Sequence, residues 1–297
     1  MKPIEVCGLT KDYGSQKGIF DLSFSVEKGE IFGFLGPNGA GKTTTIRHLM
    51  GFIRQDAGNA FIKGMDCFTK HALILERLGY LPGEISLMED MSGTEYLHFM
   101  AGMKKLRDKS YIQELIGFLE LDPKGSIRKM SKGTKQKLAI ICAFMNRPEI
   151  LILDEPTSGL DPLMQKRFID LVLESKKNGA TILLSSHIFE EIEKTCDRTA
   201  ILRNGRLVAV EDMSTLAQKK KKIYTITFAD HTAAMQFASD QTLPVTEVAD
   251  NRVLLSVSGA PKELLFKIAN AAPIDMDIHT QSLEQLFLHF YDKEDAS

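Results

Sequence analysis

The sequence predicts an α/β main domain built around a mostly parallel sheet, followed by a smaller α+β module. Short β-rich segments alternate with helical periodicities from Met1 to about Thr215. Segments 150–153 and 181–184 are continuously apolar, as strands covered on both faces are. A glycine-rich loop at 36–43 joins an apolar strand pattern to a helical one, which places a loop with ligand-binding character at the first crossover.

This first crossover carries a phosphate-binding pattern between a strand at 31–35 and a helix at 44–50. Glycines let successive backbone N–H groups turn around an anion, and the helix N-terminus adds partial positive charge. Lys42 is expected to reach the outer phosphates, and the Thr43 hydroxyl to ligate magnesium. We therefore predict that this segment binds a nucleotide with Mg²⁺. The predicted binding residues are Gly36, Pro37, Asn38, Gly39, Ala40, Gly41, Lys42, Thr43 and Thr44.

Composition limits the other possibilities. The 297 residues, 43% of them hydrophobic, suffice for one large domain and a small one. A net charge of -2 gives no overall attraction to nucleic acid, so no nucleic-acid partner is expected. The four cysteines lack metal-ligand spacing and fit reduced thiols of the cytoplasm. No signal peptide or membrane span is expected, because the longest apolar run covers 138–145.

A helical insertion is expected at about 86–147. Ser92 and Glu95 form a capping-box pattern, and helical periodicities follow at 96–106 and 111–121. The apolar strand pattern then resumes at 150–153.

Two carboxylates, Asp154 and Glu155, follow that strand. Open parallel sheets bind ligands at the carboxyl ends of their strands, so both residues should face the phosphate loop. Asp154 is suited to hold magnesium, and Glu155 to orient and deprotonate a water that attacks the γ-phosphate. Acidic residues that merely end a strand are the alternative, which a pair beside a phosphate loop makes less plausible.

His187 follows the next apolar strand. Its imidazole could hydrogen-bond a γ-phosphate oxygen and sense that group. A lone histidine at a strand end is more often a structural residue, so this prediction depends on the neighbouring motifs.

Four lysines at 219–222 are interpreted as a solvated boundary. The predicted division is a nucleotide-binding domain at 1–215, a linker at 216–222 and an accessory α+β domain at 223–297. In the accessory domain we predict a strand at 224–228, a helix at 232–239, two strands that turn at 250–251, a helix from Pro261, a strand at 274–278 and a last helix capped by Ser282 with Gln285. This order suggests a ferredoxin-like module.

Taken together, the motifs resemble the ATP-binding subunits of ABC transporters over roughly the first 215 residues. They are the loop at 36–43, the strand and acidic pair at 150–156, the segment 158–161, His187, and the segment 130–137, in which Ser131 and Gly133 match the family signature. The resemblance implies a P-loop ATPase core with an antiparallel β subdomain and an inserted helical subdomain.

The resemblance also implies a head-to-tail dimer in which ATP lies between one subunit's phosphate loop and the other subunit's signature helix. Ser131 and Gly133 would face the γ-phosphate from that helix N-terminus. Asp161 would lie at the dimer seam, although it also fits a helix start before Pro162. Tyr13 matches the aromatic residue that stacks on adenine, with an ordinary turn tyrosine as the alternative.

Two departures from the family pattern stand out. Lys132 and Thr134 replace the commoner glycine and glutamine of the signature, and Lys132 either adds charge near phosphate or points to solvent. Gly83 stands where the family usually has a glutamine that touches magnesium. We hypothesise that the carboxylate of Glu84 takes this role.

The sequence therefore predicts an ATPase, the ATP-hydrolysing subunit of an ABC transporter with export as the expected direction. The expected partners are a transmembrane permease, docked near 83–91, and a second ATPase subunit, either identical or different. The expected location is the cytoplasmic face of the cell membrane. The alternative functions are a soluble ABC-type ATPase acting on ribosomes or DNA and, ranked last, a kinase built on the phosphate loop alone.

Overall fold

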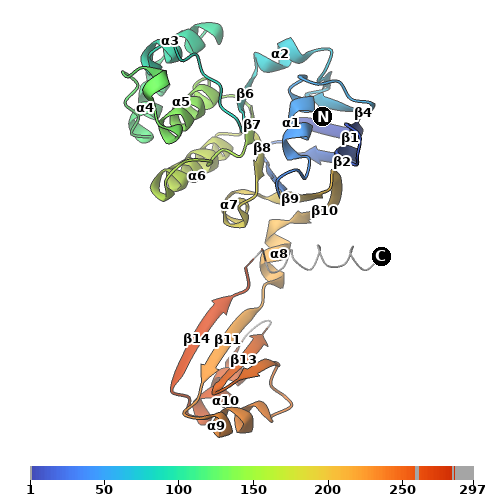
Figure 1. The fold of residues 1–297 in the computed structure, drawn as a ribbon, viewed down its shortest axis with the longest axis vertical. Helices are drawn as coiled ribbons and strands as arrows, with labels where there is room; N and C mark the ends of the chain where they lie inside the picture. Colours follow the sequence, from blue (N-terminus) through green and yellow to red (C-terminus); the bar gives the residue numbers. More distant parts are fainter. Residues whose placement is uncertain (1, 258–260, 283, 285–297) are drawn as a thin grey trace. The chain divides into compact units, whose positions relative to one another are not determined.

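Figure 1 shows the fold in a computed structural model, which describes residues 2–257, 261–282 and 284. The chain divides into two compact units, Met1–Met213 and Ser214–Ser297. The strands of the first unit are β1 (Ile4–Asp12), β2 (Gly18–Val26), β3 (Ile31–Leu35), β4 (Ala57–Ile62), β5 (Met65–Asp66), β6 (Leu78–Leu81), β7 (Ile150–Asp154), β8 (Thr181–Ser186), β9 (Arg198–Arg203) and β10 (Arg206–Asp212). Its helices are α1 (Lys42–Leu49), α2 (His71–Leu75), α3 (Gly93–Met103), α4 (Ser110–Phe118), α5 (Lys132–Phe144), α6 (Pro162–Lys177) and α7 (Phe189–Thr195), with a short 3-10 turn at Ile127–Lys129.

A six-stranded, mostly parallel sheet forms the centre of the first unit, as predicted. Its strand order is β10-β9-β3-β8-β7-β6. All neighbouring strands from β9 to β6 pair in parallel, and β10 pairs with β9 antiparallel. Because β8 lies between β3 and β7, the phosphate loop, His187 and the acidic pair all follow the same edge of the sheet.

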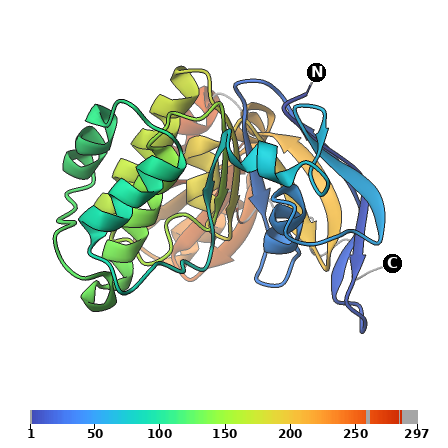
Figure 2. The same cartoon turned by 90° about the horizontal axis from the view of Figure 1, so that it is seen from above.

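The antiparallel β subdomain is a second sheet with the order β2-β1-β4-β5. Its apolar side chains share one buried cluster with the central sheet and with α1. Phe24 of β2, for example, packs edge-on against Phe34 of β3 with ring centroids 4.8 Å apart. The helix that follows the phosphate loop, α1, is therefore enclosed between the two sheets, and Figure 2 shows it on the side of the unit where the β subdomain lies.

Helices cover the other face of the central sheet, and the insertion adds α3, α4 and α5 to them (Figure 2). Phe144 of α5 and Phe168 of α6 are buried and meet edge to face. The capping box is confirmed: Ser92 Oγ accepts the Glu95 N–H, and the Glu95 carboxylate accepts the Ser92 N–H. The helical insertion is thus anchored to the sheet by α5, the helix that carries the signature segment.

Among the described residues between Lys222 and Thr280, the second unit forms a four-stranded antiparallel sheet with two helices. Its elements are β11 (Lys222–Thr227), α9 (His231–Ala238), β12 (Val245–Ala249), β13 (Arg252–Val257), α10 (Lys262–Asn270) and β14 (Asp275–Thr280). The strand order β12-β13-β11-β14 with antiparallel neighbours is that of a ferredoxin-like βαββαβ module. Tyr224, Ile226 and Phe228 form the centre of its core.

The segment interpreted as a linker differs from a solvated coil. Residues 216–219 lie in α8 (Met213–Lys219), and Lys222 begins β11. Leu216 is buried, which gives this stretch a packed side in spite of its lysines. The predicted last helix, with Gln285, lies outside the described residues.

Two further features are the state of the cysteines and the length of the apolar helices. The four cysteines are free thiols, in agreement with the sequence. Within the described ranges, no helix is both long enough and apolar enough to cross a bilayer.

Candidate active site

The phosphate loop runs from the end of β3 into α1 in a conformation that requires glycine. Gly41 is the N-cap of α1 and has φ +105°, in the left-handed region that costs other residues strain. A Cβ at Gly36 would lie 2.4 Å from the carbonyl oxygen of Leu202. Because Gly41 caps the helix, α1 begins at Lys42, two residues earlier than predicted.

Lys42 is buried beneath this loop. Its ammonium donates hydrogen bonds to the carbonyl oxygens of Gly36 at 2.6 Å and Pro37 at 3.2 Å. The same nitrogen lies 3.1 Å from Glu155 Oε1. A single cation therefore links the phosphate loop to the acidic pair at the end of β7.

Glu155 occupies the centre of the site. Its φ of +47° lies in the left-handed region, which is uncommon for a residue with a side chain and often marks functional positions. The backbone N–H donates to Ser185 of β8 at 3.1 Å. The second carboxylate oxygen, Oε2, lies 2.6 Å from Nδ1 of His187. The structure thus brings Lys42, Glu155 and His187 into direct contact.

Asp154 is fully buried at the end of β7. Ser185 Oγ donates to its Oδ1 at 2.5 Å, while Oδ2 lacks a hydrogen-bond partner of good geometry among the described residues. Burial raises the pKa of Asp154, and the hydroxyls of Ser185 and Thr43 oppose this rise. A buried carboxylate oxygen beside a threonine hydroxyl provides oxygen donors for a hard cation.

Tyr13 and the phosphate loop line one cavity of about 530 Å³ together with Glu155. Tyr13 is 55% exposed, which leaves its ring available for a planar ligand. The cavity also contains Gln16, Lys17 and Asn204, which the sequence did not single out. Asn204 belongs to the Asn-Gly turn between β9 and β10. The Asn-Gly pair predicts a hairpin turn from the sequence, but it does not predict that this turn lies beside the phosphate loop.

The signature residues form a separate group. Ser131 is the N-cap of α5 and accepts the Thr134 N–H at 3.1 Å. A Cβ at Gly133 would lie 2.9 Å from the carbonyl oxygen of Gly159. Lys132 is exposed and donates to Ser158 Oγ at 3.1 Å, so its ammonium contacts the loop after β7.

Asp161 caps α6 by accepting the Met164 N–H at 3.0 Å, with Pro162 in the first turn, as the sequence allowed. The described residues that line the Tyr13 cavity do not include Ser131, Gly133 or Asp161. One chain therefore presents a phosphate loop and a signature helix as two separate surfaces.

Gly83 and Glu84 follow β6 near the acidic pair. A Cβ at Gly83 would lie 3.2 Å from Asp154 Oδ2, so a longer side chain at this position would meet that carboxylate. Glu84 itself is exposed. In the described part of the chain, no three His, Cys, Asp or Glu side chains gather as metal ligands, so Glu84 does not join Asp154 in such a group.

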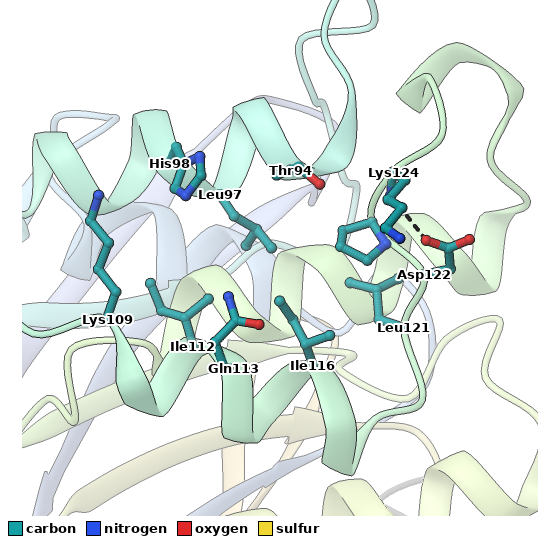
Figure 3. Close-up of a pocket in the computed structure, with 11 residues that line it drawn as sticks. Thr94, Leu97, His98, Lys109, Ile112, Gln113, Ile116, Leu121, Asp122 and Lys124 are labelled. Carbon is teal, nitrogen blue, oxygen red and sulfur yellow. Dashed lines mark hydrogen bonds between the residues drawn. The ribbon is translucent and has the colours of Figure 1, made fainter.

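A second pocket lies between α3 and α4 in the helical insertion (Figure 3), and no residue of the phosphate loop lines it. Its volume is about 440 Å³, and its walls include Leu97, Ile112 and Ile116. The lining also includes Thr94, His98, Lys109, Asp122 and Lys124, with a single carboxylate, so this pocket lacks the acid pair that lies beside the phosphate loop.

Comparisons with known proteins agree with this geometry. The ABC transporter family model matches residues 19–158. An uncharacterised ABC transporter ATP-binding protein of Methanocaldococcus jannaschii is 39% identical over 74% of this chain and 81% of its own length. The bacitracin transport ATP-binding protein BcrA of Bacillus licheniformis is 37% identical over 78% of this chain and 77% of its own. The linearmycin resistance ATP-binding protein LnrL of Bacillus subtilis is 30% identical over 95% of this chain and 96% of its own.

Solved structures resemble the first unit. The ATP-binding subunit of an ABC transporter has a TM-score of 0.66 and 33% identity, and the similarity covers 73% of this chain and 92% of that one. A dimeric ABC transporter cassette has a TM-score of 0.64 and 20% identity over 71% of this chain and 98% of its own, which supports the fold.

Proposed function

This chain belongs to the ABC transporter family, and we propose that it is the ATP-hydrolysing subunit of an exporter. As a member of this family it binds and hydrolyses ATP. The observation that carries the proposal is the contact of Lys42, Glu155 and His187 beside the phosphate loop. The LnrL relative matches nearly the whole chain, so the accessory unit accompanies the cassette in at least one resistance protein.

We assign ATP binding to the Tyr13 cavity. The ring of Tyr13 offers a face for adenine, and the backbone N–H groups of residues 38–44 offer donors to the phosphates. Lys42 already lies under the loop with three oxygen contacts, so a phosphate oxygen would share its ammonium with Glu155. The positive end of α1 adds to the attraction for the phosphates.

We assign water activation to Glu155. A carboxylate held by Lys42 on one oxygen and by His187 on the other is fixed in orientation, which favours attack along one line. His187 is half exposed and could donate to the γ-phosphate while it contacts Glu155. Glu155 and His187 would both act at the bond to the γ-phosphate that hydrolysis breaks, so we expect loss of either residue to impair turnover.

The residues present fit magnesium. Thr43 and Asp154 would hold it, and the cation would supply positive charge that neutralises the phosphates. Magnesium commonly uses one or two protein ligands and completes its shell with phosphate and water, which agrees with the small donor set. Glu84 remains our hypothesis for a further contact through water.

The second half of the site would come from another ATPase subunit. Ser131 and Gly133 lie at the N-terminus of the 13-residue helix α5, where partial positive charge can face a γ-phosphate. We propose a head-to-tail dimer in which this surface closes on the Tyr13 cavity of the partner, with Asp161 near the seam. Nucleotide hydrolysis would then control whether the two subunits stay together.

We propose that the permease contacts residues 83–91, which join β6 to the helical insertion. Met88 is 44% exposed, and Ile85, Leu87 and Met91 are half-buried beside it. We propose that this segment holds the chain at the cytoplasmic face of the membrane through the permease. The names of the relatives favour transport over action on ribosomes or DNA.

Two complementary variants test the shared site. Lys42→Ala removes the phosphate half, and Ser131→Arg fills the signature half. Each homodimer should have less than about 5% of the wild-type turnover, because every site has one defective half. An equimolar mixture should recover roughly a quarter, because half of the dimers then contain one intact site. A mixture as inactive as the parents would contradict the head-to-tail arrangement.

The transport role needs a separate test. The Glu155→Gln full-length chain with Mg-ATP, purified from its native cells, should retain an integral membrane protein. Met88→Glu in the same background should lose that protein while keeping ATP binding. If Glu155→Gln binds ATP and retains no membrane protein, the exporter assignment fails while the ATPase assignment stands.

A further inference from the structure

Glu191 is a buried carboxyl that the assignments above do not use. It lies in the first turn of α7, four residues after His187, and is 4% exposed. Carboxyl groups are almost never buried this fully unless they are paired. The neighbouring Glu190, by contrast, is exposed and pairs with Lys194 in the ordinary way of a helix surface.

Hydrogen bonds connect Glu191 to the loop that carries His187. Ser186 Oγ donates to Glu191 Oε2 at 2.5 Å. The same hydroxyl accepts the N–H of Ile188 at 3.0 Å, so it closes a tight turn around His187. Glu191 therefore fixes the side chain of Ser186, and Ser186 in turn fixes the backbone of Ile188 on the other side of His187.

A second contact reaches the loop that follows Glu155. Thr157 Oγ1 lies 3.4 Å from Glu191 Oε2. The hydroxyl of Thr195 donates a hydrogen bond to the backbone carbonyl of Glu191 at 2.7 Å, which fixes the backbone of Glu191 within α7. The two loops whose side chains meet at the 2.6 Å contact of Glu155 and His187 thus share one buried anchor.

We propose that Glu191 is a positioning residue that fixes the His187 loop against the loop after Glu155. Its carboxyl accepts hydrogen bonds and does not touch nucleotide. The inference rests on the proposed role of His187 in ATP hydrolysis. Loss of the acceptor frees Ser186 and Ile188, and the imidazole then samples positions away from Glu155.

The test compares three variants of the full chain. Glu191→Leu removes the acceptor at similar volume, Glu191→Gln keeps an acceptor without charge, and Glu190→Leu makes the same change on the exposed neighbour. We expect Glu191→Leu to lower kcat about 30-fold with KM for ATP changed less than about threefold. Glu191→Gln should keep at least about half of the wild-type kcat, and Glu190→Leu should equal wild type. Equal loss in Glu191→Gln and Glu191→Leu, or no loss in either, would overturn the proposal.

A double-mutant cycle asks whether Glu191 acts through His187. His187→Ala should lower kcat, and adding Glu191→Leu should lower it by less than about twofold more. Multiplied losses would overturn the positioning role. If Glu191→Leu does not fold, Ser186→Ala replaces it in the cycle with the same two outcomes. A wild-type chain that does not hydrolyse ATP, or a His187→Ala variant with full activity, would instead contradict the proposed function.

Discussion

Nδ1 of His187 lies 2.6 Å from Oε2 of Glu155. The two residues directly follow the neighbouring strands β8 and β7, so the register of a parallel sheet brings together side chains that are 32 positions apart in the sequence. Lys42 Nζ lies 3.1 Å from the other carboxylate oxygen and forms an ion pair with it, although that oxygen accepts no hydrogen bond of good geometry among the described residues. The carboxylate is held between the phosphate loop and the histidine, where a water near a γ-phosphate would have to be activated.

Glu155→Gln should separate binding from hydrolysis. The amide keeps the shape of the carboxylate but cannot accept a proton, so turnover should fall about 100- to 1000-fold. ATP affinity should be unchanged or higher, because a negative charge beside the phosphates is removed. Phosphate release and fluorescent-nucleotide binding measure the two effects. Glu149→Gln, at an exposed residue paired with Lys63, is the control, and a Glu155→Gln turnover within threefold of wild type would exclude the assigned role.

Tyr13→Ala should weaken ATP binding without changing the chemical step. Loss of base stacking costs about 1–3 kcal/mol, which corresponds to a rise in Kd of about 5- to 150-fold. Tyr13→Phe keeps the ring and should bind within about twofold of wild type. Equilibrium nucleotide binding measures both variants. An alanine variant with wild-type affinity would make Tyr13 an ordinary turn residue.

Most of the fold could be predicted because its signals are local. The strand at 31–35 and the order of elements in the accessory unit follow from short-range periodicity, and the structure confirms the strand and the order as far as β14. The start of α1 at Lys42 was missed because it depends on the left-handed φ of Gly41. Residues 216–222 were assigned to a linker because of the lysine run at 219–222; the structure has 216–219 in α8, with the side chain of Leu216 buried.

The site was predicted less completely because part of it is assembled by contacts distant in sequence. Lys42, Glu155 and His187 belong to recognisable patterns, and strand order brings them together. Glu191 follows Glu190 in the first turn of a helix, where two acids fit an ordinary exposed surface. Its burial depends on Ser186 and Thr157, which no local pattern reveals.

Glu84→Ala tests the hypothesis of a magnesium contact. If Glu84 holds magnesium or its water, the Mg²⁺ concentration needed for half-maximal ATP turnover should rise about tenfold. A glutamine at position 83 would begin 3.2 Å from Asp154 Oδ2, so Gly83→Gln added to Glu84→Ala should reverse much of this rise. Asp90→Ala, an exposed acid in the same segment, is the control. Unchanged kinetics in Glu84→Ala would remove Glu84 from the site.

Ser92→Ala should destabilise the helical insertion through loss of its cap. The substitution removes the Ser92 Oγ that accepts the Glu95 N–H, one of the two hydrogen bonds of the capping box. Loss of such a cap costs about 1 kcal/mol. The free energy of unfolding from urea denaturation measures the effect. Ser126→Ala is a matched control, because Ser126 precedes the 3-10 turn without a side-chain cap bond. Equal stability of the two variants would contradict a stabilising capping box.

Glu191 should also give the chain a characteristic dependence of stability on pH. Burial raises the pKa of Glu191 from 4.5 to about 7; the hydrogen bond from Ser186 opposes this rise, the charge of Glu155 adds to it, and the bond from Thr157 opposes it slightly. The folded state then holds the proton more tightly than the unfolded state. The resulting stabilisation is fully present below about pH 4.5 and is lost as the pH rises through about 7.

Glu191→Gln cannot titrate, so it lacks this pH-dependent stabilisation. The unfolding free energy of wild type relative to Glu191→Gln should therefore decrease from about pH 5 to about pH 8, by up to about 3 kcal/mol. Other titrating groups are common to both chains and cancel in the difference. Urea denaturation at several pH values measures it, with Glu190→Gln as the exposed control. A pH-independent difference would mean that Glu191 carries the same charge in the folded and unfolded states, and would leave its hydrogen bonds as its sole contribution.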